Sequence, residues 1–305
     1  MDQLPQQLII GLSVGATYAL IALGYTMVYG VLRLINFAHG DVYMVGAVSG
    51  YYLSNWMVKH NAPLALTLVV VFAGSILICA VLGFVIERFA YRPLRSRPRL
   101  VVLITAIGVS LLLENLAQLG VFFGPTPRQY PESIKQALAT QVFRAGSTIS
   151  LTYSDILSLS VSLGLMALLT WVILKTRTGL ALRAVSFRFD TAALMGVNTD
   201  RIISFTFMFG SSLAAVAGVM DGLRYNVYPL MGVLYGLKAF VAAVLGGIGS
   251  IPGALVGGLL IGLIETLVKA YISSAYADAV SFVILILVLL VKPSGLFRST
   301  AMEKV

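Results

Sequence analysis

A few ionisable side chains stand inside otherwise apolar stretches of this sequence, and they are the first candidates for chemistry. Glu114, Asp221, Lys238 and Glu265 are each flanked on both sides by aliphatic and small residues. Ionisable residues at such positions are rare in membrane helices, and they mark transport pathways, proton relays or ion pairs. The four residues are therefore functional candidates.

Sequence spacing divides these residues into two kinds. Asp221 has Arg224 three residues later and Glu265 has Lys269 four residues later, so both are predicted to form pairs within one helix, with a structural role. Glu114 and Lys238 have no such local partner. They either pair across helices or line a pathway, and Lys238 could also extend towards a membrane interface.

The segment Asn36-Phe37-Ala38-His39-Gly40-Asp41 brings polar groups between two apolar runs. Irregular backbone at membrane depth is tolerated where it is buried in protein or lines a cavity, and transporters build sites from such breaks. Asn36, Phe37, His39, Asp41, Glu114 and Lys238 are thus candidates for a translocation pathway. A plain cytoplasmic turn, with Asp41 capping the next helix, fits the segment equally well.

Catalysis by the chain itself is not expected. The two histidines, His39 and His60, fall near the ends of apolar runs and form no convincing pair with a nucleophile. The sequence also lacks the Gly-x-x-x-x-Gly-Lys-Ser/Thr phosphate loop, so ATP would have to be hydrolysed by another chain. We expect no enzyme and no cofactor or metal bound by this chain.

The elements that carry these residues are predicted to be membrane-spanning helices. Hydrophobic residues make up 59% of the chain and charged residues only 11%, which excludes a water-soluble fold. Because one span needs about 20 apolar residues, we expect an all-α bundle of about nine spans in a single domain over residues 1–305. The apolar runs are Leu8–Leu32, Val42–Val58, Leu64–Val85, Val101–Phe123, Ile156–Leu174, Ile202–Leu223, Gly232–Leu245, Ile251–Val268 and Ala279–Val291, of which the second, seventh and ninth could be partial, broken or re-entrant.

Basic residues predict the orientation. The net charge of +9 comes from clusters in the gaps between apolar runs, which the positive-inside bias explains better than nucleic-acid binding. The clusters are Arg88 to Arg99, Lys175 to Arg201 and Lys292 to Lys304, and nine spans place all of them in the cytoplasm with the N-terminus outside. Residues 124–153, with Pro125, Pro127 and Pro131, form the predicted outer loop, with room for one surface helix. No removable signal peptide is expected.

The cytoplasmic loop 175–201 contains a short helix-forming stretch. Asp190 is predicted to cap a helix that starts at Thr191, and Gly196 to end it in a left-handed turn. The small residues allow close approach of a partner, so the stretch is either a plain connector or a docking knob. The residues of this candidate coupling loop are Asp190, Thr191, Ala192, Ala193, Leu194, Met195 and Gly196.

Glycines gather near the C-terminal third. The spacings Gly253 to Gly257 and Gly258 to Gly262 predict close helix packing, and the break before them could serve as a hinge between the seventh and eighth spans. The hinge or packing candidates are Gly246, Gly247, Gly249, Pro252 and Gly253.

Several of these stretches together resemble the permeases of branched-chain amino acid ABC importers, H-type subunits. The resemblance lies in Leu182–Val185, Thr199–Ile202 and the Ala-Ala-x-x-Gly loop, and it extends to Tyr18–Gly24, Val31–Gly40, Glu87–Pro93, Gly236–Phe240, Gly246–Gly253 and Lys292–Leu296. It covers nearly the whole chain and is weakest from Pro125 to Ser150. Thr191 departs from the pattern, since acidic residues are common there in such loops.

The resemblance implies a bacterial inner-membrane importer that carries leucine, isoleucine or valine. The implied partners are a second homologous permease, two cytoplasmic ATPase subunits that use ATP, a periplasmic binding protein and the lipid bilayer, with no nucleic acid. Urea or short amides are the alternative cargo. A stand-alone secondary transporter is the alternative class, although its ion coupling would favour more acidic residues at depth than this chain has.

Overall fold

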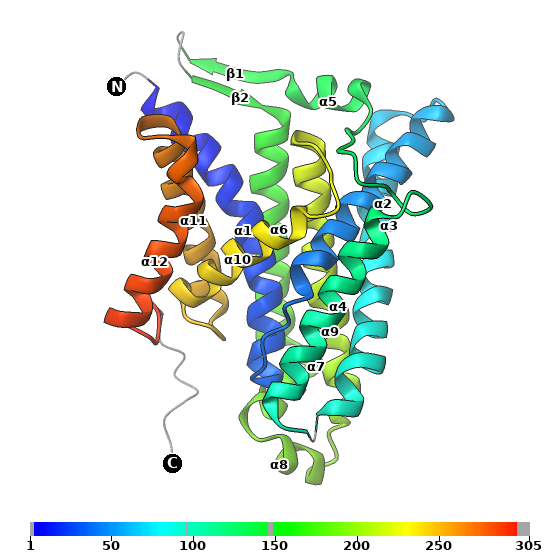
Figure 1. The fold of residues 1–305 in the computed structure, drawn as a ribbon, viewed down its shortest axis with the longest axis vertical. Coiled ribbons are helices and arrows are strands. Elements are labelled where there is room, and N and C mark those ends of the chain that lie inside the picture. The colour runs from blue at the N-terminus through cyan, green and yellow to red at the C-terminus, as the bar shows by residue number, and fades with distance from the viewer. Residues whose placement is uncertain (1–2, 96, 146–148, 298–305) are drawn as a thin grey trace.

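The computed structural model describes residues 3–95, 97–145 and 149–297, and it shows a bundle of long helices (Figure 1). Arg298 and Lys304 of the third basic cluster lie outside the described residues. The helices are α1 (Leu4–Leu32), α2 (His39–Lys59), α3 (Leu64–Ile86), α4 (Arg99–Gln118), α5 (Glu132–Ala139), α6 (Tyr153–Lys175), α7 (Arg177–Phe187), α8 (Phe189–Leu194), α9 (Thr199–Arg224), α10 (Met231–Gly246), α11 (Ile251–Tyr271) and α12 (Ala277–Val291).

Each of the nine apolar runs corresponds to one helix, but they are not equivalent as spans. Within the described chain, seven helical stretches are long and apolar enough to cross a membrane: α1, α3 with the two short turns that follow it (Leu64–Leu94), α4, α6, α9, α11, and α12 with the 3-10 turn that precedes it (Ser274–Val291). Helix α10 has 16 residues, about 24 Å of helix, which is shorter than a bilayer core of about 30 Å. Helix α2 is long enough but more polar. The chain is an all-α, multi-pass membrane protein, and about nine spans is an approximate number.

Short elements join the long helices. A π-helical turn (Glu87–Tyr91) and a 3-10 turn (Arg92–Leu94) follow α3, and a second 3-10 turn (Ser274–Tyr276) precedes α12. The predicted outer loop contains the expected surface helix, α5, and also an antiparallel hairpin of β1 (Gln141–Ala145) and β2 (Ile149–Thr152) that the sequence analysis missed. Figure 1 shows α5 and the hairpin at one end of the bundle and α8 at the other.

Helices α1 and α9 form the centre of the bundle, whereas α4 and α12 are mainly exposed at its edge. Glycines bring the backbones of the central helices close together, alongside large buried side chains such as Tyr18 and Phe207. A Cβ on Gly15 would lie 2.7 Å from the Cα of Leu259, and a Cβ on Gly258 would lie 2.5 Å from the Cα of Ala19. Because lipid gives helices little hydrophobic reason to associate, such backbone approach is what packs α1 against α11.

The segment between α4 and α6 is anchored to the bundle by Tyr130. Its hydroxyl donates a hydrogen bond of 2.9 Å to the carbonyl of Ala47 in α2. Room for the ring exists only because Gly50 and Gly222 have no side chain there, since a Cβ on Gly50 would lie 2.1 Å from the tyrosine oxygen. Burial raises the pKa of Tyr130, so its hydroxyl remains a donor.

Candidate translocation and coupling sites

The backbone between α1 and α2 is broken and buried within the protein. Helix α1 ends at Leu32, and the next residue, Arg33, has a φ of 55° although it is not a glycine. The chain then runs without regular helix to α2. The side-chain oxygen of Asn36 accepts a hydrogen bond of 2.8 Å from the hydroxyl of Tyr91. The segment is therefore not a plain exposed turn. Asp41 does not cap α2, which begins at His39 without a side-chain cap.

A cavity of about 320 Å³ opens beside this break. Three of the predicted pathway residues, Phe37, Asp41 and Glu114, line it together. The sequence analysis missed Ser110, one turn before Glu114 on α4, and Tyr25 on α1. The other lining residues are apolar or glycine and come from α4 and α10: Ile107, Leu111, Gly232, Val233, Gly236 and Leu237.

Ser110 joins the two acidic residues of this cavity. Its hydroxyl donates a hydrogen bond to Asp41 and lies 3.4 Å from Oε1 of Glu114. The other oxygen of Asp41, Oδ1, is buried and has no hydrogen-bond partner among the described residues. A site with two carboxylates and one shared donor can accept further donors.

His39 does not line this cavity. Its ring packs edge-on against Tyr25 with the ring centroids 4.7 Å apart, and it occupies the space that a side chain at residue 24 would need. A Cβ on Gly24 would lie 2.2 Å from Nε2 of His39. His39 therefore contributes packing at the helix break.

Lys238 belongs to a second ionic cluster, on the other side of α10. Its Nζ lies 2.9 Å from Glu265 in α11 and 2.6 Å from Asp278 in α12. The hydroxyl of Tyr18 donates to Glu265 over 2.7 Å, and Lys269 donates to the same carboxylate over 2.5 Å. The predicted pair of Glu265 with Lys269 is confirmed. Of the alternatives left open for Lys238, the structure shows pairing across helices, and Lys238 does not line the cavity beside the helix break.

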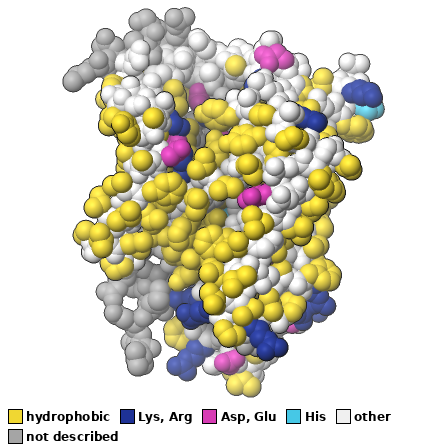
Figure 2. Space-filling view, viewed as in Figure 1, with side chains coloured by type: hydrophobic (Ala, Val, Ile, Leu, Met, Phe, Trp, Pro, Cys, Tyr) yellow, Lys and Arg dark blue, Asp and Glu magenta, His cyan; other side chains and the backbone are white. Residues whose placement is uncertain are grey.

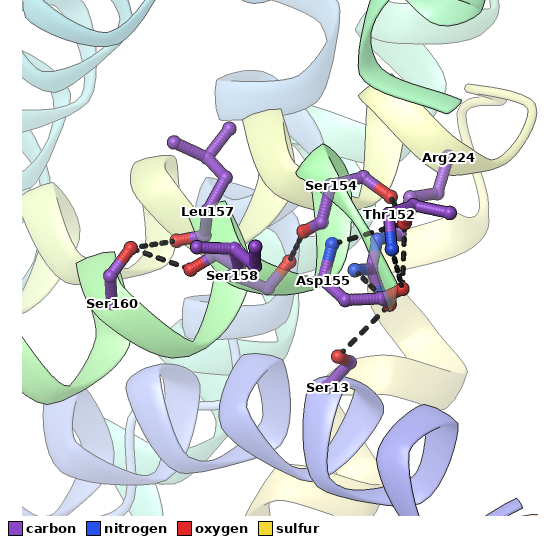
Figure 3. Close-up of polar contacts among 9 residues, drawn as sticks. Ser13, Thr152, Ser154, Asp155, Leu157, Ser158, Ser160 and Arg224 are labelled. Atoms are coloured by element: carbon purple, nitrogen blue, oxygen red, sulfur yellow. Dashed lines mark hydrogen bonds and ion pairs between the residues drawn. The ribbon is translucent and has the colours of Figure 1, made fainter. Parts of the chain in front are cut away.

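The predicted pair of Asp221 with Arg224 is wrong. Arg224 reaches from the end of α9 to Asp155 at the start of α6, where the ion pair measures 2.8 Å (Figure 3). Asp155 also accepts from Ser13 of α1 and belongs to a capping box with Thr152. Asp221 accepts instead from the hydroxyl of Tyr43 in α2. Spacing of three residues did not decide the pairing because the arginine lies at a helix end and can reach away from its own helix.

The candidate coupling-loop residues lie at the opposite end of the bundle from the β-hairpin (Figure 1). Helix α8 spans Phe189–Leu194, and Asp190 is in its first turn but makes no capping hydrogen bond, so the predicted cap is wrong. Gly196 does adopt the predicted left-handed conformation, with φ of 84°, and a Cβ there would meet no atom within 4 Å. Ala192 is buried, whereas Leu194 and Met195 are 88% and 80% exposed. The large apolar side chains of Leu194 and Met195 are thus exposed at the C-terminal end of α8.

Basic side chains gather at the same end of the molecule, as Figure 2 shows. Some of these basic side chains form ion pairs with acidic residues of the same chain. Arg95 pairs with Glu87 and lies 2.7 Å from Asp200, and Arg92 also pairs with Asp200. These pairs join the segment after α3 to the start of α9, which directly follows the candidate coupling loop.

The glycine break between α10 and α11 contacts the end of the described chain. Gly247 and Gly249 have φ of 101° and 94°, which side-chain-bearing residues rarely adopt. The backbone N–H groups of Leu296 and Phe297 donate to the carbonyls of Leu245 and Gly246 over 2.8 and 3.0 Å. Gly246 and Gly253 pack backbone to backbone, and Pro252 is the second residue of α11. A packing role is evident here, and a hinge role remains a prediction.

Comparison with known proteins identifies a family whose sequence pattern matches this chain. The family described as "Branched-chain amino acid transport system / permease component" matches residues 7–289. The chain belongs to this family. The permease protein BraD of Pseudomonas aeruginosa is 43% identical over 98% of this chain and 97% of its own length, and LivH of Escherichia coli is 44% identical over the same shares. Both are named high-affinity branched-chain amino acid transport system permease proteins.

More distant relatives extend beyond these bacteria. A LivH of Methanocaldococcus jannaschii is 28% identical over 91% of this chain and 87% of its own. Among solved structures, PsaBC from Streptococcus pneumoniae in complex with Fab aligns with 95% of this chain and 92% of that chain at 14% identity and a TM-score of 0.48. The family resemblance that the motifs indicated is confirmed by the family match and the bacterial relatives.

Proposed function

We propose that this chain is the membrane-spanning permease subunit of an ABC importer that translocates leucine, isoleucine and valine across the bacterial inner membrane. The observation that carries the proposal is the near full-length identity of 43–44% with permease proteins named for branched-chain amino acid transport. The broken backbone beside a cavity supports it, because transporter sites are built at such breaks. The chain itself makes and breaks no covalent bond.

The proposed partners are a second homologous permease, two ATPase subunits that use ATP, and a periplasmic binding protein. Reconstitution of these subunits with this chain in liposomes tests the function. We expect ATP-dependent uptake of radiolabelled leucine that requires the binding protein. Uptake by this chain alone, or uptake of urea or acetamide in place of leucine, contradicts the proposal.

We propose further that α8 and the turn at Gly196 transmit the ATPase movement to the bundle. The exposed apolar pair Leu194 and Met195 supports this role, since exposed apolar patches rimmed by polar residues mark protein interaction sites. Gly196→Val adds the cost of a left-handed backbone, about 1–2 kcal/mol. Ala193→Arg places a long charged side chain on the exposed tip. Both variants should lower uptake and weaken co-purification of the ATPase subunits.

Gly124→Val is the matched control for this experiment. Gly124 also has a left-handed backbone, with φ of 93°, and no atom closer than 3.6 Å to an added Cβ, but it follows the far end of α4. It should retain ATPase association. Normal uptake and association in both loop variants would show that the loop is only a connector.

The proposed orientation places α8 and the C-terminus in the cytoplasm and the N-terminus in the periplasm. A reporter fused after Arg99 or at the C-terminus should then read cytoplasmic, and one fused near Gln129 should read periplasmic. Helix α4 separates these two reporter sites and is long enough to cross the bilayer. The same reading at Arg99 and Gln129 would contradict the orientation.

A further inference from the structure

The cavity beside the helix break combines an acidic wall with an aliphatic one. Asp41 on α2 and Glu114 on α4 supply the acidic wall, bridged by Ser110. The volume of about 320 Å³ lies at the lower end of the roughly 300–1,000 Å³ of small-molecule sites. The remaining surface is mainly aliphatic and aromatic, with Phe37, Ile107, Leu111, Val233 and Leu237.

The acidic wall has more acceptors than donors. A serine hydroxyl has one proton, so Ser110 can donate to only one of the two carboxylates at a time. Asp41 is 1% exposed, and its Oδ1 has no hydrogen-bond partner among the described residues. No lysine, arginine or histidine stands among the described residues that line the cavity. A buried carboxylate with so few partners is costly unless a donor or cation reaches it.

Close backbone contact fixes this acidic wall against α10. A Cβ on Gly40 would lie 2.4 Å from the carbonyl oxygen of Gly232, and a Cβ on Gly232 would lie 3.0 Å from Oδ1 of Asp41. The backbones of α2 and α10 are therefore in close contact directly beside Asp41, on one side of the cavity. Such a fixed arrangement favours a ligand over adjustable side-chain pairing.

We propose that this cavity binds the α-ammonium group of the amino acid in transit, with Asp41 and Glu114 as acceptors and the aliphatic wall around the branched side chain. An ammonium group has three donors and one positive charge, which matches the surplus of acceptors. The inference rests on the proposed function. In this proposal, the permease site binds the ammonium group that leucine, isoleucine and valine have in common. Any preference among the three comes from contacts of their side chains with the aliphatic wall.

The test measures leucine binding to the intact complex of this chain with its partner permease and ATPase subunits, without the binding protein. Radiolabelled leucine is displaced either by 3-methylbutylamine, which keeps the ammonium and the branched chain, or by 4-methylpentanoate, which lacks the ammonium. We expect displacement by the amine and none by the acid. Equal displacement by both compounds overturns the proposal.

Substitutions of the two acidic residues test whether leucine binds in this cavity. Asp41→Asn and Glu114→Gln should each weaken leucine affinity by at least about tenfold, the effect of losing a charged hydrogen-bond partner. Glu132→Gln makes the same acid-to-amide change on α5, outside the cavity, and should bind leucine normally. Should Asp41→Asn fail to assemble into the complex, Glu114→Gln on the more exposed helix α4 decides. Unchanged affinity in an assembled Glu114→Gln complex overturns the proposal.

Reconstituted transport separates this inference from the proposed function. If the unaltered importer takes up no leucine in liposomes, the proposed function fails. If it takes up leucine but the complex shows no leucine binding at millimolar concentration, the function stands and the ammonium site is overturned.

Discussion

Two groups of buried charges lie on either side of α10, and they differ in how completely they are partnered. In the cluster of Lys238 and Glu265, the glutamate accepts from three donors and the lysine contacts two carboxylates. In the cavity, Asp41 and Glu114 share one hydroxyl and no cation among the described residues. The balanced group joins four helices and holds the bundle together. The acidic residues of the cavity, Asp41 and Glu114, have carboxylate oxygens that can still accept hydrogen bonds from a ligand.

The largest effect expected from this difference is on stability, at the balanced cluster. Lys238→Met leaves Glu265 buried with a partly exposed lysine as its only cation, and loss of one partner of a buried pair costs about 3–5 kcal/mol. The midpoint of thermal unfolding should fall by several degrees, measured by size-exclusion chromatography of heated, fluorescently tagged chain in detergent. The double variant Lys238→Met with Glu265→Gln should recover part of the loss. An unchanged midpoint in the single variant would show that the cluster is not structural.

Substitutions in the cavity should affect uptake rather than stability. Asp41→Asn and Glu114→Gln remove charge from an acidic excess, so the unfolding midpoint should change little while uptake falls by about tenfold or more. Leucine, isoleucine and valine should lose uptake by similar factors, because the change affects the group they share. A switch in preference among the three with an unchanged rate would place specificity in these residues and break the comparison.

A smaller effect is expected for the hydroxyl that bridges the acidic residues. Ser110→Ala removes one neutral donor, worth about 0.5–1.5 kcal/mol, so uptake should fall by a few-fold. Ser160→Ala is the matched control, since that serine is exposed and bonds only to the backbone of its own helix. Equal uptake in the two variants would remove Ser110 from the site.

The smallest effect is expected at the edge of the balanced cluster. The side chain of Lys269 is 49% exposed, and its pair with Glu265 spans four residues of one helix. Lys269→Met should lower stability by about 1 kcal/mol or less, because solvent screens the half-exposed ammonium and Lys238 still pairs with Glu265. A loss as large as that of Lys238→Met would mean that the exposed lysine, and not the buried one, balances Glu265.

The helices could be predicted from the sequence because the apolar runs are long and separated by charged gaps. The run predicted from Leu64 to Val85 corresponds to α3, which ends at Ile86. The start of α2 was predicted too late, at Val42, because His39 and Asp41 are polar, whereas in the bundle both are buried within the helix. The β-hairpin was missed, since its short strands have no strong alternation.

The candidate sites were harder to predict from the sequence, because they are formed by residues far apart in the chain. Apolar surroundings singled out Glu114 and Lys238 separately, but nothing in the spacing shows that Glu114 shares a cavity with Asp41, 73 positions earlier, while Lys238 does not. Ser110 gave no signal at all, because a serine in an apolar helix commonly bonds to its own backbone. The contacts between helices decide these assignments.

The packing of α1 against α11 also sets an order of events during synthesis. The glycine face of α1 contacts a helix that begins at Ile251, so α1 enters the membrane long before its partner has been made. At about 5–20 residues per second, the delay is on the order of 10–45 s. During that time Gly11 and Gly15 have no neighbouring backbone from α11. The face of α1 that carries Gly11 and Gly15 therefore contacts lipid or other proteins until the C-terminal third of the chain has been made.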